Sequence, residues 1–337
     1  MILIDSVYIN DGGGLVLLKQ LVNILNKTDL KIFYLFDDRT KEVFSDFNSL
    51  NTQFISNSFL DRMNFYKSNK DKFFSILCFG NIPPPVKVEA KVFVYFHQPL
   101  FLTVPKDFSF KNKLIYGVKQ FILNRYKCNA NIWLTQSSLI QIELANKYFK
   151  KDFRNIKVLP FYPALDFSID NEIRKKNSFL YVSNTAPHKN HKNLIYAFCN
   201  AYDKTQLGEL ILTIPSSATS LCSLIKEKIN IGYPIKNVGF VDRNLLVRLY
   251  LSTEYLIYPS LAESFGLGLA EAIDGGCKVI ASDLPYTYQV CNPSLTFNPY
   301  TKESIESAII KAVRVNLPSS KKIISNDINQ LIKLLSD

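Results

Sequence analysis

The chain has 337 residues, of which 47% are hydrophobic and 20% are charged. This length is long for one hydrophobic core and natural for two domains, and the composition is that of an ordinary globular protein. No run of eighteen apolar residues occurs, so no membrane-spanning helix is predicted. The N-terminus reads as a strand and lacks the basic region and cleavage site of a signal peptide.

The cysteines and the net charge indicate the redox environment of the protein and the kind of partner that it binds. The six cysteines are scattered, without a CxxC motif or a zinc-type histidine spacing, and are expected to be reduced thiols in the cytoplasm. The net charge is +11, and residues 106–157 hold 11 Lys and Arg against 3 Asp and Glu. Such an excess indicates an anionic surface or substrate. Nucleic acid is a rival partner, but it is not expected because no recognised binding motif accompanies the charge.

The first half of the chain alternates strands and helices, which predicts a parallel sheet covered on both faces. A helix is expected after the first strand, with Leu17, Leu18, Leu21, Val22 and Leu25 on its buried stripe. The strands are expected at 2–7, 31–36, 53–56, 75–79, 92–96, 131–135 and 156–160.

Two features of this half are candidates for a ligand site. Gly13 and Gly14 belong to a glycine triplet that is either an ordinary strand-to-helix turn or a set of amides facing the crevice beyond the strand ends. His97 follows the strand at 92–96, where open α/β sheets bind ligands. The alternative for His97 is a histidine that bonds to local backbone.

Residues 111–127 predict an amphipathic helix. Its apolar face contains Leu114, Ile115, Val118, Phe121 and Ile122, and we expect that face to pack on the sheet. The other face, with Lys113, Gln120, Asn124 and Lys127, is expected to be solvated. Its basic side chains suit anionic lipid headgroups, so peripheral membrane attachment is a hypothesis.

A domain boundary is expected where the sequence turns polar, at 163–177. A strand at 178–182 and a short loop then lead to Lys189, which opens a helix. Further strands are expected at 210–214, 238–241 and 255–258. His188 and His191 lie three positions apart without a third ligand nearby, so no metal site is predicted there.

The stretch 258–283 carries the strongest motif. Glu263 and Glu271 stand eight positions apart, and Gly266 and Gly268 between them let the backbone approach a ligand closely. The unpaired N–H groups at the start of the following helix suit a phosphate, and the two carboxylates suit sugar hydroxyls. From the spacing alone, the pattern indicates either a sugar-nucleotide site or an ordinary strand–loop–helix turn of a doubly wound fold with two solvated glutamates.

This motif, PSLAESFGLGLAEAIDGG, closely resembles the donor-site segment of retaining, nucleotide-sugar-dependent glycosyltransferases of family 4. Gly268 departs from the family pattern, which usually has proline at that position. The resemblance implies the α/β GT-B fold, in which two Rossmann-like doubly wound domains face a central cleft. It implies an acceptor-binding domain at 1–165, a donor-binding domain at 166–318, and a final helix within 319–337 that packs back toward the first domain.

The resemblance also implies roles for particular residues. Glu271 would accept the ribose hydroxyls and Glu263 would contact the transferred sugar. Lys189 and the amides of 265–267 would stabilise the leaving diphosphate. The full set of expected site residues is Gly13, Gly14, His97, Asn184, Lys189, Phe240, Val241, Glu263, Phe265, Gly266, Leu267 and Glu271.

Within this set, Phe240 and Val241 would meet the nucleotide base through their main chain. Gly13 and Gly14 would face the diphosphate and sugar, and His97 would orient the sugar or acceptor. Asn184 stands where relatives commonly carry an arginine that neutralises phosphate. His188, His191 and Lys192 are candidates to replace that charge.

The implied activity is transfer of a hexose-type sugar from a nucleoside-diphosphate sugar to a glycan or polyprenyl-diphosphate-linked acceptor, in bacterial O-antigen, capsule or other surface polysaccharide synthesis. No cofactor and no metal are expected, because no DxD motif lies in a plausible loop. We expect a cytoplasmic enzyme, peripheral on the inner face of the membrane where the acceptor is lipid-linked. The alternatives are a nucleotide-sugar epimerase of the same fold and a non-catalytic binder of sugar nucleotides or nucleic acid.

Overall fold

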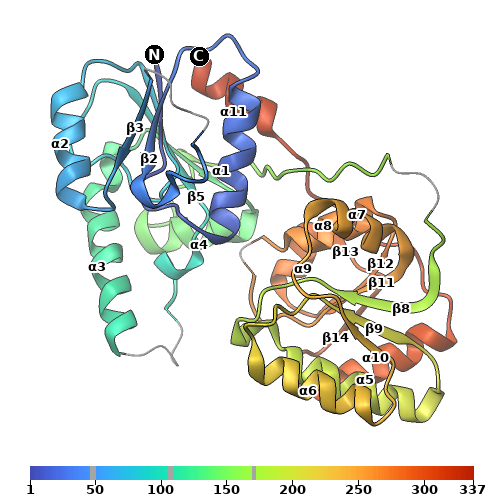
Figure 1. The fold of residues 1–337 in the computed structure, drawn as a ribbon. Coiled ribbons are helices and arrows are strands. Elements are labelled where there is room, and N and C mark those ends of the chain that lie inside the picture. The colour runs from blue at the N-terminus through green and yellow to red at the C-terminus, as the bar shows by residue number, and fades with distance from the viewer. Residues whose placement is uncertain (46–50, 105–109, 169–171, 264) are drawn as a thin grey trace. The chain divides into compact units, whose positions relative to one another are not determined.

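A computed structural model describes the whole chain except residues 46–50, 105–109, 169–171 and 264. The chain forms two compact units, one made of residues 1–163 with 325–337 and one made of residues 164–324. Each unit is built on a parallel β-sheet with helices on both faces (Figure 1). The division lies at the start of the expected boundary region 163–177 and two residues before the expected end of the first domain at 165. The last segment, 325–337, is part of the N-terminal unit.

The sheet of the N-terminal unit has the strand order β3-β2-β1-β4-β5-β6-β7, with every pair parallel. The chain moves outward from β1 to β3 and then returns beside β1 as β4, so the strand order reverses there. The observed strands lie within two residues of the expected ones. They are β1 (Ile2–Asp5), β2 (Ile32–Asp37), β3 (Thr52–Ile55), β4 (Ser75–Cys78), β5 (Lys91–Phe96), β6 (Ile132–Thr135) and β7 (Ile156–Val158).

Helices cover both faces of this sheet, α1 and α11 on one face and α2 on the other (Figure 1). The expected stripe of α1 is confirmed, since all five of its apolar residues are buried. No described helix is long and apolar enough to cross a membrane. The helices of the N-terminal unit are α1 (Gly12–Leu25), α2 (Phe59–Asn69), α3 (Phe110–Tyr126), α4 (Ser138–Tyr148) and α11 (Ile328–Ser336).

Helix α3 packs largely the opposite way from the prediction. Gln120 Nε2 donates to the Leu100 carbonyl at 3.2 Å and Lys127 Nζ, just beyond the helix, donates to the Tyr148 carbonyl at 2.6 Å, so two residues of the predicted solvated face contact the unit. Only Leu123 of this helix is buried among the side chains that the structure describes. Of the predicted packing face, Ile122 does pack on the core, whereas the rest points to solvent, with exposures of 60% at Leu114, 40% at Ile115, 51% at Val118 and 70% at Phe121.

The returning C-terminal segment is tied to the segment that leaves the N-terminal unit. Asn326 Nδ2 donates to the Tyr162 carbonyl at 2.8 Å, and the Asp327 N–H donates to the Pro160 carbonyl at 2.8 Å. Beyond this tie, Leu331 and Leu335 of α11 are fully buried. The two ends of the unit are thus joined through both main chain and core.

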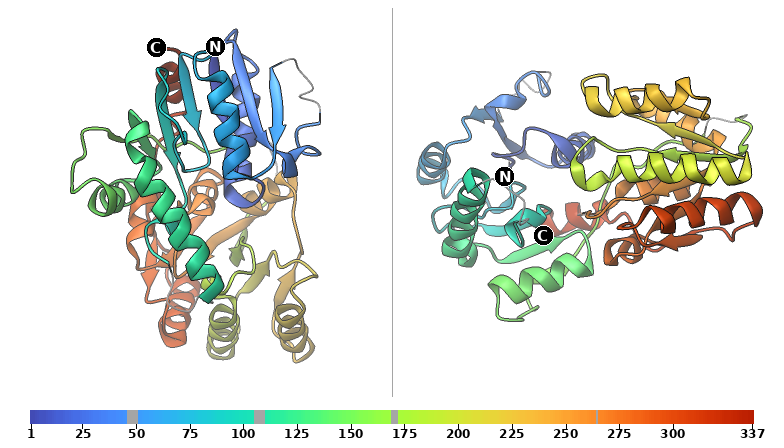
Figure 2. Two further views of the ribbon diagram at one scale, coloured as in Figure 1. Left: turned by 90° about the vertical axis from the view of Figure 1, so that its left-hand side faces the viewer. Right: turned by 90° about the horizontal axis from the view of Figure 1, so that it is seen from below.

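The sheet of the C-terminal unit has the order β10-β9-β8-β11-β12-β14 and reverses between β8 and β11. Helices α5, α6 and α10 lie on one face and α7 and α8 on the other (Figures 1 and 2). The unit contains β8 (Lys175–Tyr181), α5 (His191–Thr205), β9 (Glu209–Leu212), α6 (Thr219–Asn230), β10 (Ile235–Asn237), α7 (Arg243–Ser252), β11 (Thr253–Tyr258), α8 (Leu267–Asp274), β12 (Lys278–Ser282), α9 (Pro285–Val290), β13 (Cys291–Asn292), β14 (Leu295–Phe297), α10 (Lys302–Arg314) and β15 (Lys321–Lys322).

The strand expected at 238–241 is wrong, because β10 ends at Asn237. The Asn237 side chain accepts hydrogen bonds from the N–H groups of Ile214, at 2.9 Å, and Gly239, at 3.3 Å. Gly239 takes a left-handed conformation with φ of +74°, which ends the strand in a turn. The side-chain amide of Asn237 thus makes hydrogen bonds where the apolar residues at 238–241 had suggested a continued strand.

A buried ion pair joins β1 to α2. Arg62 Nη2 lies 2.7 Å from Asp5 Oδ2, and both side chains are almost completely buried. The remaining donors of Arg62 reach the carbonyls of Ile82, at 2.9 Å, and Pro83, at 3.0 Å. Tyr66 donates its hydroxyl to the same Asp5 oxygen at 2.6 Å. This network fixes the loop after β4 to the end of β1.

Replacing Arg62 by Met should destabilise the protein by about 3–5 kcal/mol, because the Asp5 carboxylate would stay buried without its cation. Urea unfolding followed by circular dichroism measures the change. The matched control is Arg154→Met, whose pair with Asp152 at 2.7 Å is exposed and should contribute far less to stability. Equal losses in the two variants would contradict the structural role of Arg62.

Candidate active site

Two loops of the C-terminal unit meet where its strand order reverses. One follows β8 and the other follows β11, and parallel strands bring both to the same edge of the sheet. The Leu261 N–H donates to the His188 carbonyl at 2.8 Å. Asn190, in a left-handed conformation, donates through Nδ2 to the carbonyls of Pro259, at 3.2 Å, and Pro299, at 2.8 Å. The loops are therefore fixed to each other by main-chain contacts.

These loops bring Lys189 and Glu263 together from positions 74 residues apart. Lys189 Nζ lies 2.6 Å from Glu263 Oε1, and each side chain is only 10% exposed. Tyr258 donates its hydroxyl to the same Glu263 oxygen at 2.9 Å, and Tyr181 donates to the Lys189 carbonyl at 2.8 Å. The sequence predicted the lysine and the glutamate, but it did not indicate the two tyrosines that hold them.

Glu271 lies on α8 and is also buried, but its pairing is looser. Tyr250 donates its hydroxyl to Glu271 Oε2 at 3.4 Å, and Arg243 Nη1 lies 3.8 Å from Oε1. Burial raises the pKa of Glu271 to about 7, against the opposing effect of the Arg243 charge. The carboxyl therefore exchanges its proton near neutral pH.

The loop between the two glutamates ends in a left-handed glycine. Gly266 has φ of +75° and is the residue before α8, and a Cβ there would also lie 3.2 Å from Leu269 Cδ1. The first amides of a helix have no partner within it, so they are available to an anion. The Phe265 side chain is buried and Leu267 is half-buried, so a ligand would meet their main chain. Residue 264 lies outside the described residues.

Asn184 contributes no charge and its side chain accepts a hydrogen bond from the Ala186 N–H at 3.2 Å. His188 and His191 are the histidine candidates for that charge. Burial lowers the pKa of His191 to about 4, and burial and then the Lys189 charge lower the pKa of His188. Both rings are therefore neutral at pH 7, and Lys192 is exposed at the start of α5.

The loop after β10 presents Phe240, whose side chain is exposed, and Val241, which is half-buried. Asp242 caps the next helix, since its carboxylate accepts from the Leu245 N–H at 2.8 Å. This cap places Arg243 in the first turn of α7, from which it reaches Glu271. Arg243 is a site residue that the sequence analysis missed, because no spacing links it to the motif.

In the N-terminal unit, Gly14 and His97 lie in contact. A Cβ on Gly14 would lie 2.9 Å from His97 Cε1, whereas Gly13 has nothing within 4 Å. His97 Nε2 lies 3.0 Å from the Phe79 carbonyl, so this nitrogen donates, and burial lowers the pKa of His97 to about 4. Asn81 accepts from the His97 N–H at 2.8 Å. The His97 ring is neutral and hydrogen-bonded to backbone, which agrees with the alternative interpretation given for this histidine in the sequence analysis.

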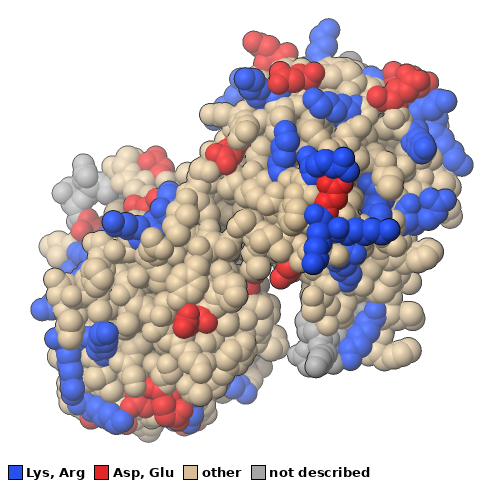
Figure 3. Space-filling view, turned by 180° about the vertical axis from the view of Figure 1, so that it is seen from behind, with Lys and Arg blue, Asp and Glu red and all other residues tan. Residues whose placement is uncertain are grey.

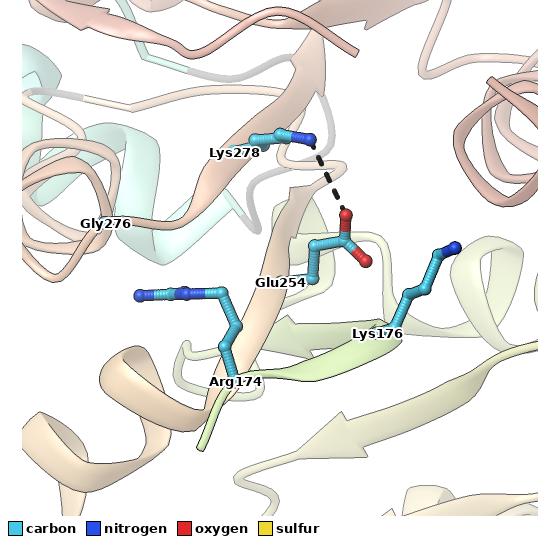
Figure 4. A pocket seen from close by; sticks show the side chains of 5 residues that line it. All are labelled: Arg174, Lys176, Glu254, Gly276 and Lys278. Carbon is cyan, nitrogen blue, oxygen red and sulfur yellow. Dashed lines mark ion pairs between the residues drawn. The ribbon is translucent and has the colours of Figure 1, made fainter. Parts of the chain in front are cut away.

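A cavity of about 270 Å³ lies elsewhere in the C-terminal unit (Figure 4). Its residues lie at or just before the amino ends of β8, β11 and β12, which is the sheet edge opposite Lys189. Arg174 donates to the Gly275 carbonyl at 2.6 Å and so holds the end of α8. The cavity is therefore separate from the candidate site. It is lined by Arg174, Lys176, Glu254, Gly276 and Lys278.

The raised pKa of Glu271 predicts a pH-dependent cost to folding. Between pH 4.5 and about 7 the folded chain keeps a proton that the unfolded chain has released, so stability falls as pH rises through this window. The loss amounts to about 3 kcal/mol in total. Glu271→Gln removes it, so the melting temperature of the variant relative to wild type should increase from pH 4.5 to 8. A difference that is constant across this range would contradict the raised pKa.

Comparisons with known proteins support a specific family. Residues 166–330 match the sequence model of the family described as glycosyl transferases group 1. The chain is 31% identical over 182 residues to the O-antigen chain mannosyltransferase RfbU of Salmonella typhimurium, covering 52% of this chain and 49% of that protein. It is 27% identical over 139 residues to the O-antigen chain mannosyltransferase B of Escherichia coli, covering 40% and 36%. The matches span half or less of these curated relatives.

Solved structures resemble both units. HepE of Anabaena, crystallised with UDP and glucose, has a TM-score of 0.64 at 15% identity, covering 93% of this chain and 89% of that one. The lipopolysaccharide outer core galactosyltransferase WaaB has a TM-score of 0.66 at 16% identity, covering 99% and 94%. The expected GT-B fold is confirmed. The matched residues 166–330 include Lys189, Glu263 and Glu271.

Proposed function

We propose that this protein is a retaining glycosyltransferase that moves a hexose-type sugar from a nucleoside-diphosphate sugar to a glycan or lipid-linked glycan, in bacterial surface polysaccharide synthesis. The observation that carries the proposal is the buried Lys189–Glu263 pair, 2.6 Å long, at the switch point of the second sheet. The O-antigen mannosyltransferases among the relatives and the UDP complexes among the similar structures support it.

The reaction breaks a sugar–phosphate bond, so negative charge builds on the diphosphate and positive charge on the sugar. We assign Lys189 and the amides of Gly266 and Leu267 to the diphosphate, where preorganised donors lower the barrier most. Lys189 leaves Glu263 as it turns to the phosphates. The Glu263 carboxylate, still held by Tyr258, is then left beside the sugar and its developing positive charge.

We assign the remaining contacts as the family resemblance implies. Glu271 accepts the ribose hydroxyls, and the main chain at Phe240 and Val241 meets the base. In the N-terminal unit, Gly14 and the neutral ring of His97 are assigned to the sugar and acceptor. We propose that no resident metal is needed, because Lys189 and the helix amides carry the charge stabilisation. Activity that survives EDTA is the expected result.

Lys189→Gln should lower kcat by about 10²–10³ at saturating donor, because the leaving diphosphate loses its side-chain cation. Release of nucleoside diphosphate from UDP-glucose and GDP-mannose, with lipid-linked glycan acceptor, measures turnover. Lys226→Gln is the matched control, since Lys226 is exposed on α6 of the same unit. An unchanged kcat in Lys189→Gln would remove this lysine from the site. Nucleotide binding without any acceptor-dependent release would indicate a binder instead.

The surface of helix α3 supports the proposal that the protein meets its acceptor at an anionic membrane. Phe110, Leu114, Val118 and Phe121 recur at intervals of four, four and three, so they share one exposed face. The helix contains four Lys and Arg and no Asp or Glu. Figure 3 shows basic side chains spread over the N-terminal unit. Apolar residues flanked by cations are the pattern of a helix that lies in the plane of a bilayer surface.

We therefore propose that α3 inserts its apolar face among anionic lipids and holds the protein at the inner face of the cytoplasmic membrane. The triple variant Leu114→Ser, Val118→Ser, Phe121→Ser should lower partitioning onto phosphatidylglycerol-containing vesicles by more than about tenfold, because each side chain loses its burial in the bilayer. Vesicle sedimentation measures this partitioning.

Two further variants separate insertion from general effects. Leu60→Ser with Phe74→Ser, two exposed apolar residues elsewhere in the unit, should leave binding unchanged. Neutralising Lys111, Lys113 and Arg125 with Gln should weaken binding most at low salt, since screening already removes much of the attraction at high salt. Equal binding by wild type and the serine triple variant would refute insertion by α3.

A further inference from the structure

Arg243 is a basic residue of the candidate site that the sequence did not indicate, and its guanidinium has two neighbours, the Ala164 carbonyl and the Glu271 carboxyl. Its Nη2 donates to the Ala164 carbonyl at 3.1 Å, while its Nη1 lies 3.8 Å from Glu271 Oε1. The Arg243 side chain is 47% exposed and that of Glu271 only 7%. The cation therefore sits at the mouth of the site, above a buried carboxyl.

Three groups act on the Glu271 carboxyl among the residues that the structure describes. Tyr250 donates a hydrogen bond from α7 and Arg243 adds positive charge from the same helix; both favour the charged carboxylate. Asp274, one turn along α8, disfavours it, although Lys322 pairs with Asp274 at 2.5 Å. Burial opposes ionisation more strongly than any of them. The carboxyl is thus balanced between its two protonation states.

This balance matters because the two states bind hydroxyls differently. An ionised carboxylate accepts hydrogen bonds on both oxygens, whereas the protonated form must use one oxygen as a donor. Two neighbouring ribose hydroxyls that both donate need the ionised form. Arg243 is the full positive charge near the carboxyl, and attraction of this kind is strongest where water is excluded.

We propose that Arg243 is a positioning residue that keeps Glu271 charged, and that it thereby sets the lowest pH at which the site accepts a nucleotide. The inference rests on the proposed function for the identity of the ligand, but the coupling of Arg243 to Glu271 rests on geometry alone. Arg243 does not restore the charge missing at Asn184. Its positive charge acts at the ribose end of the site, where it favours the ionised form of Glu271.

The first test needs no ligand. The full chain is labelled with ¹³C at the glutamate side-chain carboxyl, and the Glu271 resonance is identified by its loss in Glu271→Gln. Arg243→Gln should move the Glu271 titration about one pH unit upward, a tenfold change in the proton equilibrium. Arg243→Lys should restore most of the shift. Arg248→Gln, which removes the same charge from an exposed position on α7, should leave the titration unchanged.

The second test measures binding of UDP-glucose and GDP-mannose by calorimetry from pH 6 to 9. Both diphosphates are esterified at each end and lose no proton in this range, and titration of the nucleotide base affects wild type and variant alike. A pH-dependent difference between the two proteins therefore belongs to the protein. Arg243→Gln should bind roughly eightfold more weakly than wild type at pH 6.5 and nearly as tightly at pH 9, as expected for a one-unit shift of one carboxyl.

The outcomes separate this inference from the proposed function. An unshifted Glu271 titration in Arg243→Gln, or a binding loss that is the same at every pH, would overturn the role of Arg243. A shifted titration without binding of either nucleotide sugar by wild type would support the coupling and count against the proposed donor. A melting temperature close to that of wild type confirms that the variant is folded.

Discussion

Both units depend on one constraint: parallel strands that are covered on both faces deliver all their carboxyl ends to a single edge of the sheet. Where the strand order reverses, the connecting helices leave in opposite directions and the loops between them stay uncovered. This is why Lys189 and Glu263 form a 2.6 Å pair across 74 positions of sequence. The same constraint in the N-terminal unit brings Gly14 against His97. The opposite edge of the second sheet carries the Arg174 cavity and none of the expected site residues.

Three carboxylates with little exposure differ in how tightly each is paired with a cation, and the tightness of the pair separates a structural role from a ligand-binding one. Asp5 Oδ2 is bound by Arg62 and Tyr66, Oδ1 accepts from the Val7 N–H at 3.3 Å, and the residue is buried, so its role is to join two elements. Glu263 has one short ion pair that a diphosphate can compete for. Glu271, with its cation 3.8 Å away, is paired most loosely, and burial consequently governs its protonation. The loosest pair is the one that a neutral hydroxyl can enter.

Sequence patterns predicted most of the elements because each strand is a short apolar run and α1 has a clear helical period. They did not predict which face of α3 packs, since the period defines two faces and only the tertiary contacts of Gln120 and Lys127 decide between them. The motif at 258–283 supplied Glu263 and Glu271, and the family resemblance supplied Lys189. Tyr181, Tyr258 and Arg243 escaped notice because their roles depend on strand neighbours that sequence distance does not reveal.

The hydrogen bonds of Asn326 to Tyr162 and of Asp327 to Pro160 have a consequence for how the protein is made. During synthesis the N-terminal sheet emerges first, but the leucines of α11 that cover one of its faces emerge last. The C-terminal unit, which is continuous from 164 to 324, has all its strands before that helix leaves the ribosome. Domains fold as units when their residues are available. The unit that is translated first therefore becomes complete only after the second unit has been synthesised, and until then the sheet face that α11 covers is exposed.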